Sequence, residues 1–304
     1  MRDKFADIIY QISKNNSKIC AIVADISPAG SMEKFREEFP ERFINCGVAE
    51  QSMISIAAGL ALKGFRPFCY TIATFAIYRP FEMIRVDLAY QNLPVTVVGM
   101  GAGLIYHSLG STHHSMEDIS IATAIPNMTV LAPCDPNEMG LATKWCATKS
   151  TGPVYMRLGK KGEKDLTKNA EEKFRIGKIR YLKKGNNIAI ISYGIIMEKV
   201  FKVDEELNRH KIYPSIISCH TIKPLDVDGI KNMLKKHKKI IVVEENVSSG
   251  SLSSKIKEIS KDYNMQSEII SFTLQDKFLK CYSSYDELLD MHGISVKKIL
   301  QKII

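Results

Sequence analysis

The 304-residue sequence lacks any apolar run near the roughly 18 residues that a membrane-spanning helix needs. Its first residues, MRDKFADIIYQISK, carry charges throughout and lack the continuous apolar stretch of a signal peptide. They instead predict an amphipathic helix with Phe5, Ile8, Ile9 and Ile12 on one face. We therefore expect neither a membrane span nor a leader.

Cysteine pairs at C-x-x-C spacing are also missing. The seven cysteines are odd in number and scattered along the chain. This pattern argues against both a disulfide framework and a zinc site. We expect reduced thiols in a cytoplasmic protein that carries no metal ion on its own ligands.

Acidic residues are fewer than basic ones, and the net charge is +9. Lysines concentrate in residues 160–184 and 231–239, without the interleaved aromatic platforms typical of nucleic-acid surfaces. Such runs more often form solvated faces. We expect no binding to nucleic acid or to a membrane.

Short β-branched runs alternate with helical patterns in both halves of the chain. This alternation predicts an α/β fold of two three-layer α/β/α domains with mostly parallel sheets. The polar segment LGKKGEKDLTKNAEE (158–172) is the expected linker, which gives domains at residues 1–165 and 173–304. The predicted strands are Ile19–Ala24, Arg42–Asn45, Phe68–Ile72, Val95–Met100, Met128–Ala132 and Val154–Arg157, then Ile188–Ser192, Ser215–Cys219 and Ile240–Val243.

Ligands of open parallel sheets bind beyond the carboxyl ends of the strands. In the first half of the chain, residues suited to chemistry collect at these strand ends, whereas fewer such residues lie at the strand ends of the second half. We therefore expect the chemistry in the first domain, within the segments Ala24–Ser27, Gly47–Glu50, Thr71–Tyr78 and Gly99–Ser115.

The segment FINCGVAEQSM (43–53) resembles the glutamate motif of transketolases and 1-deoxyxylulose-5-phosphate synthases. Further similar segments follow in family order and cover almost the whole chain. They are IAAGLALKGFRP (56–67), QNLPV (91–95), AGL (102–104), GSTHHSMEDI (110–119), PNMTVLAP (126–133), VYMRLG (154–159), HTIKPLD (220–226) and VVEEN (242–246).

One family segment is missing. In this family a G-D-G…N segment of the diphosphate-binding domain holds the Mg²⁺ that bridges the cofactor's phosphates, and the sequence contains no such segment and no P-loop. The chain thus resembles the second, C-terminal subunit of a split transketolase. The resemblance implies thiamine diphosphate as cofactor, a diphosphate-binding N-terminal partner subunit that holds the Mg²⁺, and an α2β2 heterotetramer.

The resemblance also implies roles for residues near the cofactor. Glu50 matches the glutamate that hydrogen-bonds N1′ of the aminopyrimidine, a role that requires a proton to be shared near neutral pH. Phe75 matches the aromatic residue on which that ring stacks, and Tyr78 lies one helical turn further along. The alternatives are an ordinary glutamate at a helix start and aromatic core packing.

On the substrate side, His113 matches the family's histidine near the reacting carbonyl, and His114 completes a synthase-like T-H-H pattern. Arg157 matches an arginine that holds the sugar phosphate, with a structural salt bridge as the alternative. Gly101 and Leu109 stand where many transketolases have a histidine and an aspartate that contact the sugar. We expect a different donor or acceptor, with Tyr106, His107 and Ser108 as replacement contacts.

The favoured function is transfer of a two-carbon ketol unit between sugars or sugar phosphates. Two other enzyme classes stay open: a carboligase like the deoxyxylulose-phosphate synthase, and the β subunit of a 2-oxo-acid dehydrogenase. A subunit that only assembles and has lost catalysis is the alternative outside enzymes.

Overall fold

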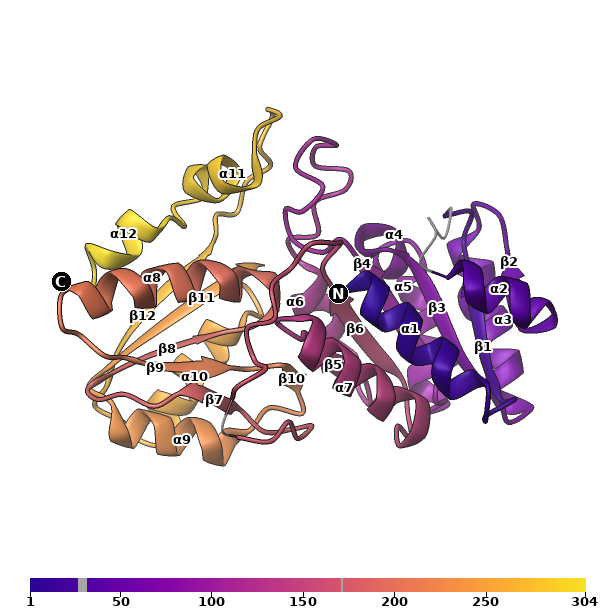
Figure 1. Cartoon of the computed structure of the whole chain (residues 1–304), viewed down its shortest axis with the longest axis horizontal. Helices are drawn as coiled ribbons and strands as arrows, with labels where there is room; N and C mark the ends of the chain where they lie inside the picture. The colour runs from indigo at the N-terminus through magenta and orange to yellow at the C-terminus, as the bar shows by residue number, and fades with distance from the viewer. Residues whose placement is uncertain (27–31, 171) are drawn as a thin grey trace.

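Two mostly parallel sheets stand side by side with helices packed on their faces (Figure 1). The computed structural model describes residues 1–26, 32–170 and 172–304, so Ser27, which we placed among the strand-end residues, lies outside the described residues. The arrangement confirms the predicted fold class. The division at residues 1–165 and 173–304 stays a prediction.

The first sheet has the strand order β10-β5-β6-β4-β3-β1-β2. Its pairs are parallel except for β10, a strand from the second half of the sequence that runs antiparallel to β5. β-branched and aromatic residues fill these strands, which suits a sheet covered on both faces. The bounds are β1 Ile19–Val23, β2 Phe43–Asn45, β3 Arg66–Ile72, β4 Thr96–Met100, β5 Thr129–Leu131, β6 Val154–Leu158 and β10 Thr221–Lys223.

Helices connect the strands of the first sheet and cover it. The N-terminal helix α1 packs against α7 and buries Phe5 and Ile9, two residues of the predicted apolar face. The bounds are α1 Arg2–Ser13, α2 Glu33–Glu38, η1 Pro40–Arg42, α3 Glu50–Leu62, α4 Ala73–Ile77, α5 Phe81–Met83, η2 Ile84–Tyr90, α6 Asp118–Ala124 and α7 Pro136–Thr148.

The second sheet has the order β12-β11-β8-β9-β7, with β7 antiparallel to β9. Ser284 caps α11 and forms a capping box with Glu287. The bounds are β7 Arg180–Lys183, β8 Ile188–Ser192, β9 Ser215–Ser218, β11 Lys239–Val247 and β12 Glu268–Leu274, with η3 Gly194–Ile196, α8 Met197–Arg209, α9 Val227–Lys236, α10 Leu252–Asp262, α11 Tyr285–Met291 and α12 Val296–Leu300.

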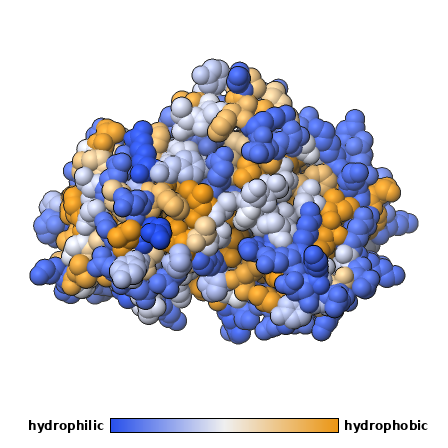
Figure 2. Space-filling view, turned by 180° about the vertical axis from the view of Figure 1, so that it is seen from behind, coloured by the Kyte–Doolittle hydropathy of each residue, from blue (hydrophilic) through white to orange (hydrophobic). Residues whose placement is uncertain are grey.

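The face opposite to that of Figure 1 mixes hydrophilic and hydrophobic side chains (Figure 2). Exposed apolar residues on α3 and η2 include Ile56, Leu62, Val86 and Tyr90. Across the described residues, we find no helix with the length and apolar character to cross a bilayer.

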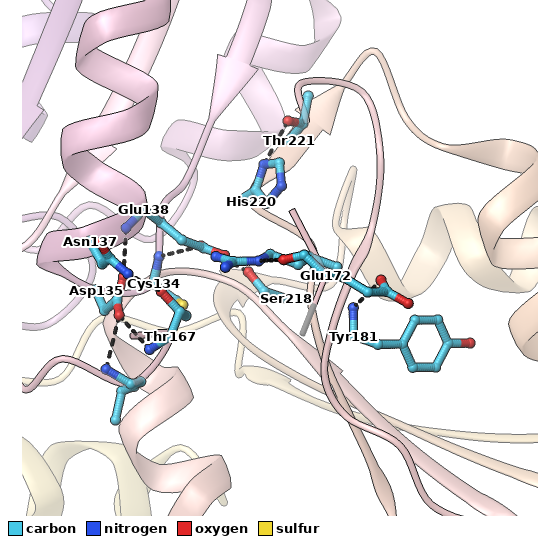
Figure 3. A network of polar contacts seen from close by, with 12 residues as sticks. Cys134, Asp135, Asn137, Glu138, Thr167, Glu172, Tyr181, Ser218, His220 and Thr221 are labelled. Carbon is cyan, nitrogen blue, oxygen red and sulfur yellow. Dashed lines mark hydrogen bonds and ion pairs between the residues drawn. The ribbon is translucent and has the colours of Figure 1, made fainter. Parts of the chain in front are cut away.

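A buried polar network joins the two sheets (Figure 3). Asp135 caps α7 and also accepts a hydrogen bond from the backbone N–H of Thr167 in the connecting segment (2.7 Å). Glu138, in the first turn of the same helix, pairs with Arg180 of β7 at 3.2 Å and accepts a hydrogen bond from Ser218 of β9 at 3.0 Å. Both members of this ion pair are buried, so it fixes one half against the other.

We predict that Arg180→Met lowers the free energy of unfolding by about 3–5 kcal/mol, because the buried Glu138 carboxylate would lose its cation. Adding Glu138→Gln should recover much of this loss, since the amide carries no charge. Urea denaturation followed by circular dichroism measures both changes. The exposed Arg175→Met is the matched control, expected within about 0.5 kcal/mol of the parent. An Arg180→Met chain as stable as this control would contradict a structural role for the pair.

Candidate active site

The candidate site lies at the carboxyl ends of β2, β3 and β4, as parallel-sheet topology predicts. Glu50 begins α3, shortly after β2 ends at Asn45. Phe75 lies in α4, which follows directly on β3. The loop that carries His113 leaves β4 at Gly101. Three separate connections therefore bring the predicted residues to one edge of the sheet.

Glu50, Phe75 and His113 gather around an arginine that the sequence analysis missed. Glu50 is 3% exposed, and Nη1 of Arg79 lies 2.9 and 3.1 Å from its two carboxylate oxygens. The Arg79 guanidinium carbon lies 4.3 Å from the centre of the Phe75 ring. His113 meets the edge of Phe75, with ring centres 5.2 Å apart. The sequence signal for this contact was the spacing of four residues between Phe75 and Arg79, which is about one helical turn.

The surroundings of His113 favour the neutral imidazole. Burial lowers its pKa below the ordinary value, and the positive charge of Arg79 lowers it further. Its Nδ1 lies 2.9 Å from the Thr112 hydroxyl, which fixes the orientation of the ring. A neutral ring here can donate one hydrogen bond and accept another, as expected of a group beside a carbonyl.

Tyr78 packs against the hydrophobic core and makes its hydrogen bonds with Glu117. Its hydroxyl donates to a carboxylate oxygen of Glu117 at 2.8 Å and accepts from the backbone N–H of the same residue at 3.2 Å. Burial raises the pKa of Tyr78, with Asp118 and Glu117 adding to the rise. Its predicted contact with the cofactor stays a prediction.

Arg157 is buried in a cluster of acids. Its Nε lies 3.3 Å from Asp118, and its Nη2 donates to the backbone oxygen of Glu245 at 2.9 Å. Tyr155 donates to the same Asp118 at 2.7 Å. Burial raises the pKa of Asp118, and the charge of Arg157 opposes that rise. Within the chain the guanidinium is satisfied by protein groups, and its predicted contact with a sugar phosphate stays a prediction.

Glu245 comes from the second half of the chain, in which we expected no chemistry. Its Oε1 accepts a hydrogen bond from the backbone N–H of Leu104 at 3.1 Å, so β11 anchors the loop after β4. Gly103 permits this close approach, because a Cβ at that position would lie 2.5 Å from the same oxygen. The VVEEN segment was visible in the sequence, but its contact with the loop was not.

The loop after β4 has a distinct shape that explains the glycine at position 101. Gly101 has φ +69°, and a Cβ there would lie 2.2 Å from the ring of Tyr106. The Tyr106 ring therefore fills the space beside Gly101 into which a larger side chain would project. Tyr106 also meets the edge of His113, with ring centres 5.7 Å apart. Leu109 lies exposed further along the loop.

His107 and His114 make other contacts than the Glu50 cluster does. Nδ1 of His107 lies 2.7 Å from the carbonyl oxygen of Ser283, so this nitrogen donates a hydrogen bond to the second half of the chain. The His114 side chain is buried, and burial lowers its pKa. Their predicted roles in substrate binding stay predictions.

The residues present fit the pyrimidine end of thiamine diphosphate. A buried carboxylate at a helix start suits a ring nitrogen, and the face of Phe75 suits a flat heteroaromatic ring. The buried hydroxyl of Thr74, next to Phe75, has no hydrogen-bond partner among the described residues. Within those residues we also find no group of three or more His, Cys, Asp or Glu side chains placed to hold a metal ion.

Together the fold and the cluster define an α/β module with a candidate site at the carboxyl ends of its parallel strands. Residues 1–162 match the transketolase pyrimidine-binding domain, and residues 177–299 match the transketolase C-terminal domain. The chain belongs to the transketolase family.

Relatives of two kinds are similar to this chain. A transketolase C-terminal section from Methanocaldococcus jannaschii is 33% identical over 305 residues, covering 100% of this chain and 95% of that protein. One of the subunits of an apulose-4-phosphate transketolase from Phocaeicola vulgatus is 31% identical, covering 84% of this chain and 82% of that protein. The 1-deoxy-D-xylulose-5-phosphate synthase of Clostridium acetobutylicum is 31% identical over 99% of this chain but 48% of its own length. The chain thus spans about half the length of such synthases.

Solved structures agree on the fold. A split-gene transketolase in an inactive β4 tetramer is similar with a TM-score of 0.89 and 28% identity, covering 99% of this chain and 96% of that one. Transketolase from Campylobacter jejuni has a TM-score of 0.81 at 20% identity, and the match covers 46% of that chain, which shows the fold alone.

The positive charge of Arg79 should have a measurable effect on the pKa of His113. We predict that His113 titrates below the ordinary value of 6.5, so its ring stays neutral at pH 7 and takes up a proton only in more acidic solution. Arg79→Met should move the pKa of His113 upward, because a neighbouring cation no longer opposes protonation. A proton NMR titration of the ring measures both values. An unchanged or lower pKa in the variant would contradict the arrangement.

Proposed function

We propose that this chain is the pyrimidine-binding subunit of a split, thiamine-diphosphate-dependent transketolase. The reaction is the transfer of a two-carbon ketol unit between sugars or sugar phosphates. The observation that carries the proposal is the buried Glu50 carboxylate at a strand end, beside the face of Phe75. Relatives of similar size that match over most of their own length add support.

Thiamine diphosphate, when bound, supplies a thiazolium carbon that becomes the nucleophile. Glu50 would share a proton with N1′ of the aminopyrimidine, and its burial would strengthen that hydrogen bond. Phe75 would orient the ring by stacking. His113, as a neutral imidazole, would donate a hydrogen bond to the oxygen of the reacting carbonyl.

The proposal includes a partner chain. This partner would carry the G-D-G…N segment and hold the diphosphate and Mg²⁺, with two copies of each chain forming an α2β2 heterotetramer. Apolar side chains exposed on α3, the helix that begins at Glu50, support burial of this surface in an assembly. Seven free cysteines support a reducing, cytoplasmic compartment.

Removal of the Glu50 carboxylate tests the catalytic role. In the complex with its partner, Glu50→Ala should lower kcat for ketol transfer by about 10²–10⁴-fold, the usual contribution of a positioned acid or base. Glu37→Ala, which removes an exposed glutamate from α2, is the matched control and should keep full turnover. A Glu50→Ala complex as active as this control would show that the chain only assembles the enzyme.

A synthase-like carboligase is the second candidate. It is favoured by the His113–His114 pair and by 31% identity to a synthase over 99% of the chain. The two functions differ in the donor, since a carboligase releases carbon dioxide from pyruvate and a transketolase cleaves a ketose. We predict turnover with ketose donors and no carbon dioxide from pyruvate, measured on the reconstituted pair. The reverse result would favour the carboligase.

A further inference from the structure

Arg79 makes both contacts that the cofactor ring would need. Its Nη1 donates to both oxygens of Glu50, at 2.9 and 3.1 Å. Its guanidinium lies over the Phe75 ring, 4.3 Å from the centre. A guanidinium is flat, donates hydrogen bonds in its plane and stacks on aromatic faces. It is therefore a close physical substitute for a protonated aminopyrimidine ring.

We propose that Arg79 occupies the aminopyrimidine site of the free chain and acts as a gate that must swing out before the cofactor ring can bind. This inference rests on the proposed function, because it assigns the same site to the ring. The ring and the guanidinium cannot both lie against Phe75 with Glu50 as their hydrogen-bond partner.

In the free chain, the burial of Glu50 favours the closed position of the gate, in which Arg79 pairs with the carboxylate. Glu50 is 3% exposed, and a buried carboxylate without a partner is costly. Arg79 supplies the missing cation and hydrogen bonds. When the ring arrives, its protonated N1′ would donate a hydrogen bond to Glu50 in place of Arg79, so the carboxylate stays satisfied in both states.

The gate also has a way to open. The Arg79 side chain is 45% exposed, whereas Glu50 is fixed in the first turn of a helix. Arg79 lies just beyond α4 and precedes Pro80, so its long side chain can turn into solvent without breaking that helix. The movement exchanges one ion pair for hydration of an exposed cation.

A closed majority state lowers the apparent affinity for the ring by the fraction of open molecules. Cofactor binding would then need the extra contacts that the partner chain provides through the diphosphate. The device would keep the free chain from holding cofactor in an incomplete site.

The test uses the purified chain and the fragment 4-amino-5-hydroxymethyl-2-methylpyrimidine, which contains the ring and no phosphate. Arg79→Met keeps the length of the side chain and removes the guanidinium. It should bind the fragment at least about tenfold more tightly than the parent in a calorimetric or NMR titration, a change of about 1.4 kcal/mol. Arg85→Met removes an exposed arginine from η2 and should leave the affinity unchanged.

Glu50→Gln separates failure of the gate from failure of the proposed function. The gain in Arg79→Met should disappear when Glu50→Gln is added, because the ring then lacks its carboxylate. Unchanged, weaker or undetectable fragment binding in Arg79→Met overturns the gate, while a loss of fragment affinity in Glu50→Gln alone would still support the proposed site. A gain that persists in the double variant contradicts both. Arg79→Gln, which removes the charge but keeps a polar group, replaces Arg79→Met if that variant fails to fold and should change the affinity in the same direction.

Discussion

The carboxylate of Glu50 is nearly inaccessible to water, and a charge in that setting needs a partner at all times. In the free chain Arg79 is this partner, and in the proposed holoenzyme a ring nitrogen replaces it. Three elements surround this carboxylate. The helix that begins at Glu50 fixes its position, α4 places Phe75 beside it, and the loop after β4 adds His113.

The second half of the chain does more than extend the molecule. Glu245 on β11 holds the loop at Leu104, and the carbonyl of Ser283 fixes His107 further along the same loop. The buried ion pair of Glu138 and Arg180 fixes the position of the two sheets relative to each other. The loop after β4 is thus positioned by contacts from the second half of the chain.

The fold was predictable because buried parallel strands are near-continuous β-branched runs, and the first sheet's strands β1–β6 lie within two residues of the predicted bounds. The sequence analysis missed β10, which has only three residues, and β12, an edge strand whose side chains are mostly half-buried. Glu50, Phe75 and His113 were found through motif resemblance. Arg79 was not, since its role depends on the turn of the chain after α4. The contact of Glu245 with Arg157 spans 88 residues of sequence and was equally invisible.

The central claim is that this chain recognises only the ring end of thiamine diphosphate. Calorimetric titration of the purified chain with thiamine diphosphate, with and without Mg²⁺, tests it most directly. We expect weak binding that Mg²⁺ does not change, because in the proposed enzyme the partner chain holds the diphosphate and the metal. Tight binding that requires Mg²⁺ would show that the chain holds the diphosphate itself, and it would contradict the account of a split enzyme.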